Sequence, residues 1–177
     1  MLGRRRFLVG SLAAAAALSG VTRKAGAVTA HPCTLSFYHI HTGEKLTITY
    51  RENGEVIPDA LAEINQYLRD FRTDQIHVID VALLDKLQAL YTAFDGRGNF
   101  EVISGYRSPR TNEVLRHATT GVAEHSLHIE GRAIDVRLTS AKTTSLRDAA
   151  LAMKSGGVGY YAESNFVHLD TGKTRSW

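Results

Sequence analysis

Two segments near the start of the globular part of the chain have the composition of β-strands. Residues 34–40 and 45–51 are rich in β-branched and aromatic residues, and the second segment alternates between polar and apolar side chains. The short connection at 41–44 contains a glycine. Two such segments joined by a short connection predict a β-hairpin.

Two later segments carry apolar residues at the three- and four-residue spacing of one helix face. We expect Asp59 to begin the first helix and Asp80 the second, because short acidic side chains are favoured at helix N-termini. The two apolar faces comprise Leu61, Ile64, Leu68 and Phe71 in the first helix and Leu83, Leu84, Leu87, Leu90, Tyr91 and Phe94 in the second. Gly96 and Gly98 end the second helix.

The second half of the chain has mainly the pattern of short strands. The predicted strands are 100–104, 132–138, 158–161 and 165–170. The last two of these form a second predicted hairpin. Short helices are predicted at 111–117 and 144–154, with a loop at 119–125. Because the strands gather late in the chain, we expect an α+β domain with helices packed on an antiparallel sheet.

The first 27 residues have the pattern of an export signal. Three arginines, the last followed by Phe-Leu, precede an uncharged alanine-rich run, and small residues follow at 25–27. This order is typical of a signal peptide, and the apolar run is too short for a comfortable membrane span. The arginine pair resembles the bacterial twin-arginine signal, while an ordinary secretory signal is the alternative. Cleavage is expected after Ala27 or Ala30, which leaves a periplasmic protein.

Removal of residues 1–27 changes the charge argument. It takes away five basic residues and no acidic ones, so the formal net charge of +3 becomes −2. The sequence therefore gives no support for nucleic-acid binding. Residues 28–177 have the size of one domain, and we expect a monomer. The single cysteine, Cys33, excludes an internal disulfide, and its neighbours do not fit a lipid anchor.

Two histidines and an aspartate form the main candidate for a functional site. His128 lies in a predicted loop, Asp135 on the more polar face of the strand that follows, and His168 in a later strand. A set of three such ligands leaves a fourth position open, which suits a catalytic Zn²⁺. Each residue alone is more often an ordinary polar side chain, so the hypothesis depends on the combination. Among the other histidines, His125 is a candidate to support the ligands from outside the set.

The spacing of these residues resembles a known signature. Residues 126–135, Ser-x-His-x-x-Gly-x-Ala-x-Asp, match the motif of the D-Ala-D-Ala metallopeptidase group, which shares its fold with lysostaphin and the hedgehog signalling domain. An upstream Ser-Gly-Tyr-Arg-Ser block and the downstream Gly-Gly-Val-Gly-Tyr-Tyr and Phe-Val-His-Leu-Asp-Thr-Gly blocks extend the match. With the leader, they resemble the YcbK/MepK-type periplasmic murein endopeptidases. The resemblance implies that His128, Asp135 and His168 are zinc ligands.

The same resemblance implies roles in substrate binding. Arg107 stands where relatives place an arginine that contacts the substrate carbonyl, and its fixed charge suits a developing oxyanion. The alternative is a structural ion pair of Arg107 with Glu124 or Asp135. Tyr106 and Ser126 lie in the matched blocks, and we expect them to contact the substrate.

The general base is the point at which the sequence departs from its relatives. Many members of the group carry a glutamate three residues before the last histidine, where this chain has Asn165. Asp170 shares a strand face with His168 and is the favoured substitute, although it could instead cap the turn that follows. Glu163, in the predicted hairpin turn, is the second candidate. A third alternative is that zinc acidifies its water without a strong base.

The implied activity is zinc-dependent hydrolysis of amide bonds in the cross-linked peptide stems of peptidoglycan. Two alternatives stay open: a carboxypeptidase that trims D-Ala-D-Ala or L,D stem ends, and a non-catalytic zinc module that binds the cell wall. An aspartic peptidase is disfavoured, because that class needs two Asp-Thr-Gly-like triplets and the chain has only the triplet at 170–172.

Overall fold

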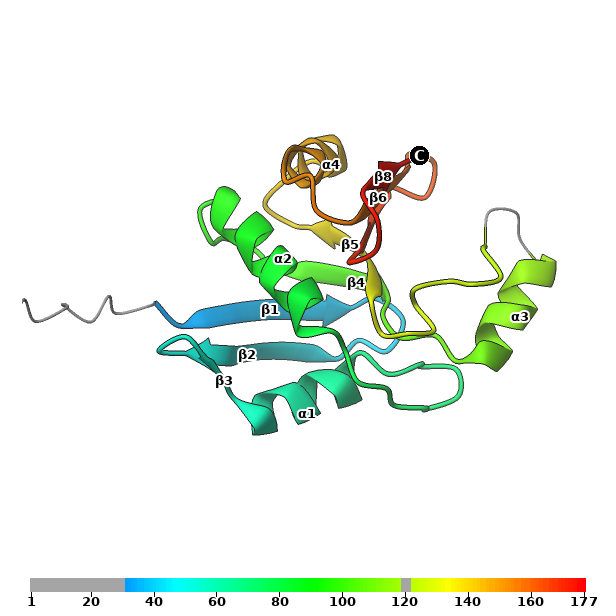
Figure 1. Ribbon diagram of the computed structural model, residues 1–177, viewed down its shortest axis with the longest axis horizontal. Coiled ribbons are helices and arrows are strands. Elements are labelled where there is room, and N and C mark those ends of the chain that lie inside the picture. The colour runs from blue at the N-terminus through cyan, green and yellow to red at the C-terminus, as the bar shows by residue number, and fades with distance from the viewer. Residues whose placement is uncertain (1–30, 119–121) are drawn as a thin grey trace, which may run out of the picture.

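The computed structural model describes residues 31–118 and 122–177, which form one eight-stranded sheet with four helices (Figure 1). The predicted signal peptide and residues 119–121 of the predicted loop lie outside this part of the chain. The strands are β1 (Cys33–His39), β2 (Lys45–Glu52), β3 (Glu55–Val56), β4 (Phe100–Ser104), β5 (Ala133–Leu138), β6 (Gly157–Tyr161), β7 (Phe166–Asp170) and β8 (Arg175–Ser176). The helices are α1 (Pro58–Tyr67), α2 (Val81–Ala93), α3 (Pro109–Ala118) and α4 (Thr143–Ala152).

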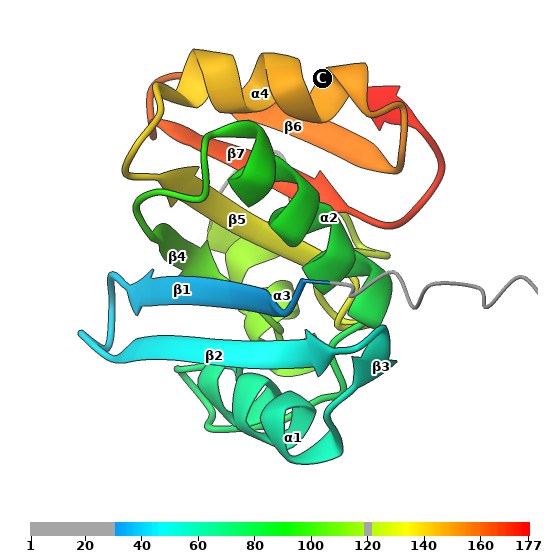
Figure 2. The ribbon, with the colours of Figure 1, turned by 90° about the vertical axis from the view of Figure 1, so that its left-hand side faces the viewer.

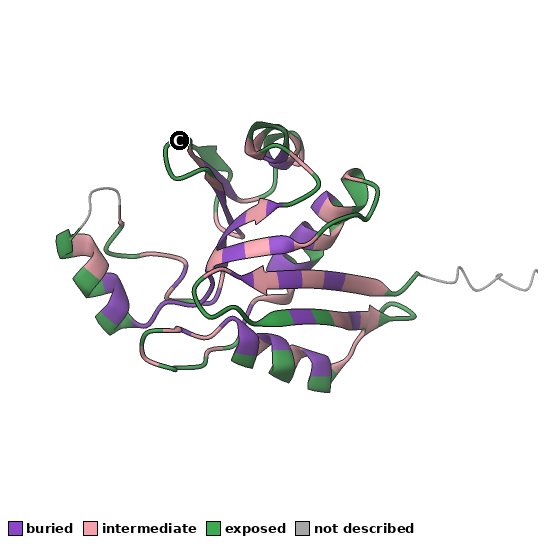
Figure 3. Cartoon of the chain, turned by 180° about the vertical axis from the view of Figure 1, so that it is seen from behind, coloured by how far each residue is buried: buried purple, intermediate pink, exposed green. Residues whose placement is uncertain are grey.

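The helices divide between the two faces of the sheet. Helices α2 and α4 lie over one face, α1 runs beside β2, and α3 lies behind the sheet (Figure 2). The core lies between the sheet and helices α1, α2 and α4. Along β1 and β4, buried positions alternate with less buried ones (Figure 3). Leu83, Leu84 and Leu87 of α2 and Leu146 of α4 are fully buried there. The opposite face of the central strands is left for polar side chains.

Both predicted hairpins are present. Strands β1 and β2 pair antiparallel with Leu35 opposite Ile48, and β6 and β7 pair antiparallel with Val158 opposite Leu169. These apolar residues face the helices, so the alternation of each strand fixes its register. The prediction of an α+β fold is confirmed.

The sheet is mixed, although we expected an antiparallel one. Its strand order is β3-β2-β1-β4-β5-β7-β6-β8, in which β1 and β4, and also β6 and β8, pair in parallel. The chain passes through α1 and α2 between β2 and β4, and a crossover of that length allows the parallel return. Strands β3 and β8 have two residues each and leave no pattern from which they could be predicted.

The helix boundaries follow local chemistry. Asp80 begins α2 as predicted, and its carboxylate accepts a hydrogen bond of 3.0 Å from the Ala82 amide. Helix α1 begins at Pro58, one residue earlier than expected, since the fixed φ of proline suits the first helical position. Phe71 lies beyond the end of α1. Among the described helices, none is long and apolar enough to cross a membrane.

Candidate metal centre

Three elements bring the predicted ligands together on the open face of the sheet. Asp135 of β5 lies directly opposite His168 of β7 in the antiparallel ladder. His128 enters from the loop before β5. That loop turns at Gly131, where φ is +66° and a Cβ atom would collide with the carbonyl oxygen of Val78. Only glycine fits this position without strain, which explains why the loop can deliver His128 to the strands.

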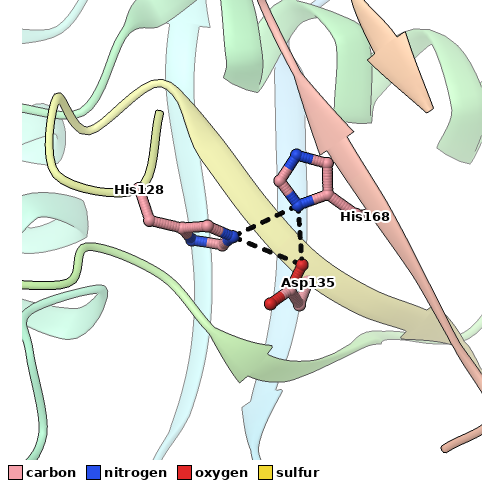
Figure 4. Close-up of side chains that lie close together, drawn as sticks. All are labelled: His128, Asp135 and His168. Atoms are coloured by element: carbon pink, nitrogen blue, oxygen red, sulfur yellow. Dashed lines mark hydrogen bonds and ion pairs between the residues drawn. The ribbon is translucent and has the colours of Figure 1, made fainter. Parts of the chain in front are cut away.

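The three side chains converge on one point (Figure 4). His168 Nδ1 lies 2.9 Å from Asp135 Oδ1 and 3.2 Å from His128 Nε2, and His128 Nε2 lies 3.3 Å from Asp135 Oδ1. All three residues are buried. In this set each residue offers one ligand atom, and those atoms lie within 4.8 Å of one another. These are residue types found in catalytic metal sites, and a set of three ligands leaves a fourth coordination position free for water or substrate.

The outer nitrogen of each imidazole has a hydrogen-bond acceptor. His128 Nδ1 donates to the carbonyl oxygen of Gly105 at 2.7 Å, and His168 Nε2 donates to Asp170 Oδ2 at 3.1 Å. In neutral rings these bonds place the protons on the outer nitrogens, so both inner nitrogens present lone pairs. With Asp135 Oδ1 they make three acceptors that face one another. A cation satisfies all three at once, so the residues fit a bound metal ion.

Burial and charge act on the pKa values of the set. Burial lowers the pKa of His128, with Asp135 acting in the opposite direction. For His168 burial also acts downward, but the hydrogen bonds to Asp135 and Asp170 outweigh it, and the pKa rises. Burial alone would raise the pKa of Asp135, yet the two histidines hold it well below its usual range. Asp135 is therefore ionised at neutral pH, as a metal ligand must be.

Asp170 is held in place by more contacts than a free carboxylate would have. It is fully buried, and its Oδ1 accepts hydrogen bonds of 2.8 Å from the amides of both Gly157 and Gly172. Its Oδ2 forms a 2.7 Å ion pair with Arg175 as well as the bond to His168. These donors outweigh the effect of burial and hold the Asp170 pKa well below its usual range. The carboxylate lies behind His168, on the side of the ring away from the ligand cluster.

Arg107 lies beside the ligand cluster and contacts one of its members. Its Nη2 forms a 3.5 Å ion pair with Asp135 Oδ2, and its guanidinium also bonds to Ser104 and Asn112. Glu124, the other predicted partner, pairs instead with Arg116. Arg107 lines the cavity in front of the cluster, and its Nε is buried without a partner among the described residues. The ion pair with Asp135 therefore holds the Arg107 guanidinium at the wall of the cavity.

The cavity in front of the ligands has a volume of about 380 Å³ and is shaped by loops and the sheet edge. The lining residues are Arg107, Leu115, Val122, Ala123, His125, Ser126, Leu127, His128, Asp135, Tyr161, Ser164, Phe166, His168, Arg175 and Trp177. Among the residues predicted to contact substrate, Ser126 lines this cavity. Tyr106 does not; it packs into the core and stacks on His77 with ring centroids 4.8 Å apart.

The two predicted bases lie outside the lining of this cavity. Asp170 is behind His168, and Glu163 is exposed in the turn between β6 and β7. Asn165, at the position of the missing glutamate, accepts a 2.6 Å hydrogen bond from Thr143. Of the described lining residues, the only carboxylate is Asp135. The aromatic part of the cavity wall was not predicted from the sequence. Trp177 lies outside the recognised motifs and follows β8, a strand of two residues that has no recognisable pattern.

Comparison with known proteins places the chain in a family. A sequence model of the peptidase family described as peptidoglycan L,D-endopeptidase MepK matches residues 27–177. The peptidoglycan L,D-endopeptidase MepK of Escherichia coli (strain K12) is 39% identical over 175 residues, which cover 98% of this chain and 96% of the relative. A protein of Haemophilus influenzae, described as a probable peptidoglycan L,D-endopeptidase MepK, is 39% identical over 150 residues, which cover 84% of this chain and 81% of the relative.

An α+β fold and a match over nearly the whole length define the chain as a member of a peptidase family. More narrowly, the chain belongs to the family of the peptidoglycan L,D-endopeptidase MepK, as the resemblance of its motifs predicted.

Proposed function

We propose that the protein is a zinc-dependent peptidoglycan L,D-endopeptidase that cuts cross-linked peptide stems. The observation that carries the zinc dependence is the convergence of three acceptor atoms, from His128, Asp135 and His168, with both ring protons turned outward. The family and the full-length relatives support the choice of substrate. The export signal predicted at residues 1–27 would bring the protein to the periplasm, where that substrate lies.

The metal and the chain have separate tasks in this proposal. When bound, zinc would supply Lewis acidity, lowering the pKa of water and polarising the scissile carbonyl. Arg107 donates a hydrogen bond to the carbonyl oxygen and holds the negative charge that grows there during attack. Its buried position and ion pair with Asp135 keep the guanidinium aimed at the cavity. Ser126 lines the same cavity and contacts the peptide.

For Asp170 we propose a positioning role. Its Oδ2 accepts the Nε2 proton of His168, so Nδ1 keeps its lone pair for the metal. Both oxygens already accept hydrogen bonds or ion pairs, which leaves Asp170 poorly placed to take a proton from water. Glu163 is likewise outside the cavity lining, so among the described residues the geometry supports neither predicted base. Metal-acidified water without a strong protein base is the alternative that agrees with this arrangement.

A second function is favoured by one specific observation. The described cavity lining contains no carboxylate besides the ligand Asp135, and Asn165 is held by Thr143. A zinc-containing module that binds the cell wall without cutting it would share these features. Release of new amino groups from purified peptidoglycan with zinc, and its absence with chelator, would exclude the binding module. Sacculus binding without release would exclude the endopeptidase.

A further inference from the structure

Trp177 is fixed beside the ligand cluster by the backbone of β6. Its amide donates to the carbonyl oxygen of Val158 at 3.3 Å, and its carbonyl accepts from the amide of Tyr160 at 3.0 Å. These bonds continue the parallel pairing of β8 with β6. The indole is thus carried by the sheet itself, which positions side chains more precisely than a loop does.

The indole lies against β6 at a glycine, where the strand has no side chain. Gly159 pairs with His168 across the β6–β7 ladder, and a Cβ atom at Gly159 would lie 2.6–2.8 Å from three atoms of the indole. The ring centroids of His168 and Trp177 are 5.2 Å apart. Glycine at this point of the strand therefore makes room for an aromatic ring next to a predicted metal ligand.

Two neighbours hold the ring, yet much of it stays open. The indole Nε1 donates to Tyr161 Oη at 3.1 Å, and the Arg175 guanidinium lies 4.9 Å from the indole centroid. Tyr161 stacks in turn on Phe166 with centroids 4.5 Å apart. Trp177 nevertheless remains 51% exposed and lines the cavity in front of the predicted ligands. A large aromatic ring that is held in place but left exposed in a cavity is typical of a binding anchor.

We propose that the exposed indole of Trp177 is a specificity-determining contact, which packs against the peptide residue that flanks the scissile bond. The inference rests on the proposed function and names the part of the site that receives the stem. Arg107 faces the cavity from the β4 side, whereas Trp177 closes it at the β6–β8 edge. A peptide bond held at the ligands would extend along this aromatic wall. The contact is apolar, so it acts on binding rather than on the reacting atoms.

The chain offers a direct probe of this contact, because it contains a single tryptophan. The purified protein is titrated with cross-linked stem peptides freed of glycan, with chelator present so that the peptides are not consumed. We expect the tryptophan emission to shift to shorter wavelength and its quenching by acrylamide to fall about twofold as the ring is covered. Emission that stays unchanged while calorimetry detects binding would overturn the inference, and so would a change produced only by peptide-free glycan strands.

Kinetics of zinc-loaded variants provide the second arm. Trp177→Ala is expected to raise KM about tenfold with kcat within about twofold, while Trp177→Phe keeps KM within about threefold. Ile76→Ala is the matched control, since Ile76 is 55% exposed and is not part of the cavity lining. An unchanged KM in a folded Trp177→Ala protein that still cuts peptide overturns this inference alone. Failure of the unaltered protein to bind or cut the peptides overturns the proposed function as well.

Discussion

Replacement of Asp170 by asparagine tests how the metal centre is built, because it changes the hydrogen-bonding character of one atom. Asn Oδ1 can still accept from the amides of Gly157 and Gly172, which both bond to Oδ1 now. The amide nitrogen then replaces Oδ2 and faces two donors, His168 Nε2 and an Arg175 guanidinium nitrogen. A donor opposite a donor favours the other His168 tautomer, whose proton sits on Nδ1.

The magnitude follows from the role of the outer partner. Loss of such a partner typically lowers metal affinity 10–100-fold, or by about 1.4–2.7 kcal/mol. We therefore expect Asp170→Asn to bind zinc 10–100-fold more weakly, and to recover at least about a tenth of native kcat once zinc is saturating. Competition with a calibrated chelator gives the affinity, and peptide hydrolysis at saturating zinc gives kcat.

A large loss of kcat with zinc affinity unchanged would show that Asp170 does not act by positioning His168. If Asp170 is the general base, Asp170→Asn should keep zinc affinity within about twofold and lose at least about 100-fold in kcat at saturating zinc. Glu163→Gln serves as the matched control, because Glu163 is exposed and outside the cavity lining. We expect it to keep both parameters within about twofold, and a large loss of kcat would identify Glu163 as the base instead.

Three further predictions address the oxyanion, the loop and a buried charge. Arg107→Lys should lower kcat about 100-fold, because one ammonium cannot replace the fork of donors, and peptide hydrolysis that stays near native would contradict the oxyanion role. Gly131→Ala should lower the free energy of unfolding by more than about 1 kcal/mol in a denaturant titration, since its φ of +66° and the Val78 carbonyl exclude a Cβ; equal stability would contradict this. Burial lowers the pKa of Lys86 to about 8, from 10.5 in the unfolded chain. Between pH 8 and 9.5 the unfolded state therefore binds more protons than the folded state. The free energy of unfolding should rise with pH in this range, by at most about 1.4 kcal/mol per pH unit. Lys86→Met should lose this rise, and an equal slope in both proteins would refute the assignment.

The sequence could predict how Asp135 and His168 lie relative to each other, because both belong to regular strands. The alternation in β5 put Asp135 on the polar face, and the pairing of Asp135 with His168 agrees with that expectation. The hairpins and the start of α2 followed from local composition in the same way. These features depend on neighbours in the sequence, which a pattern can reveal.

The remaining features depend on contacts between distant segments. Asp170 shares a strand face with His168, as predicted, but the donors from Gly157 and Arg175 that occupy its oxygens come from other strands. The parallel pairing of β1 with β4 depends on the path through two helices. Trp177 reaches the cavity because Gly159 leaves space on a neighbouring strand. No spacing in the sequence predicts any of these contacts.

Digestion of purified peptidoglycan, with the products identified by mass spectrometry, tests directly whether the protein is a zinc-dependent endopeptidase. The protein is compared in its zinc-loaded and chelator-stripped forms. We expect cross-linked dimers to fall to monomers only in the presence of zinc. Loss of a terminal residue with intact dimers would instead mean a carboxypeptidase, and no product from a protein that binds one zinc tightly would contradict the enzymatic account.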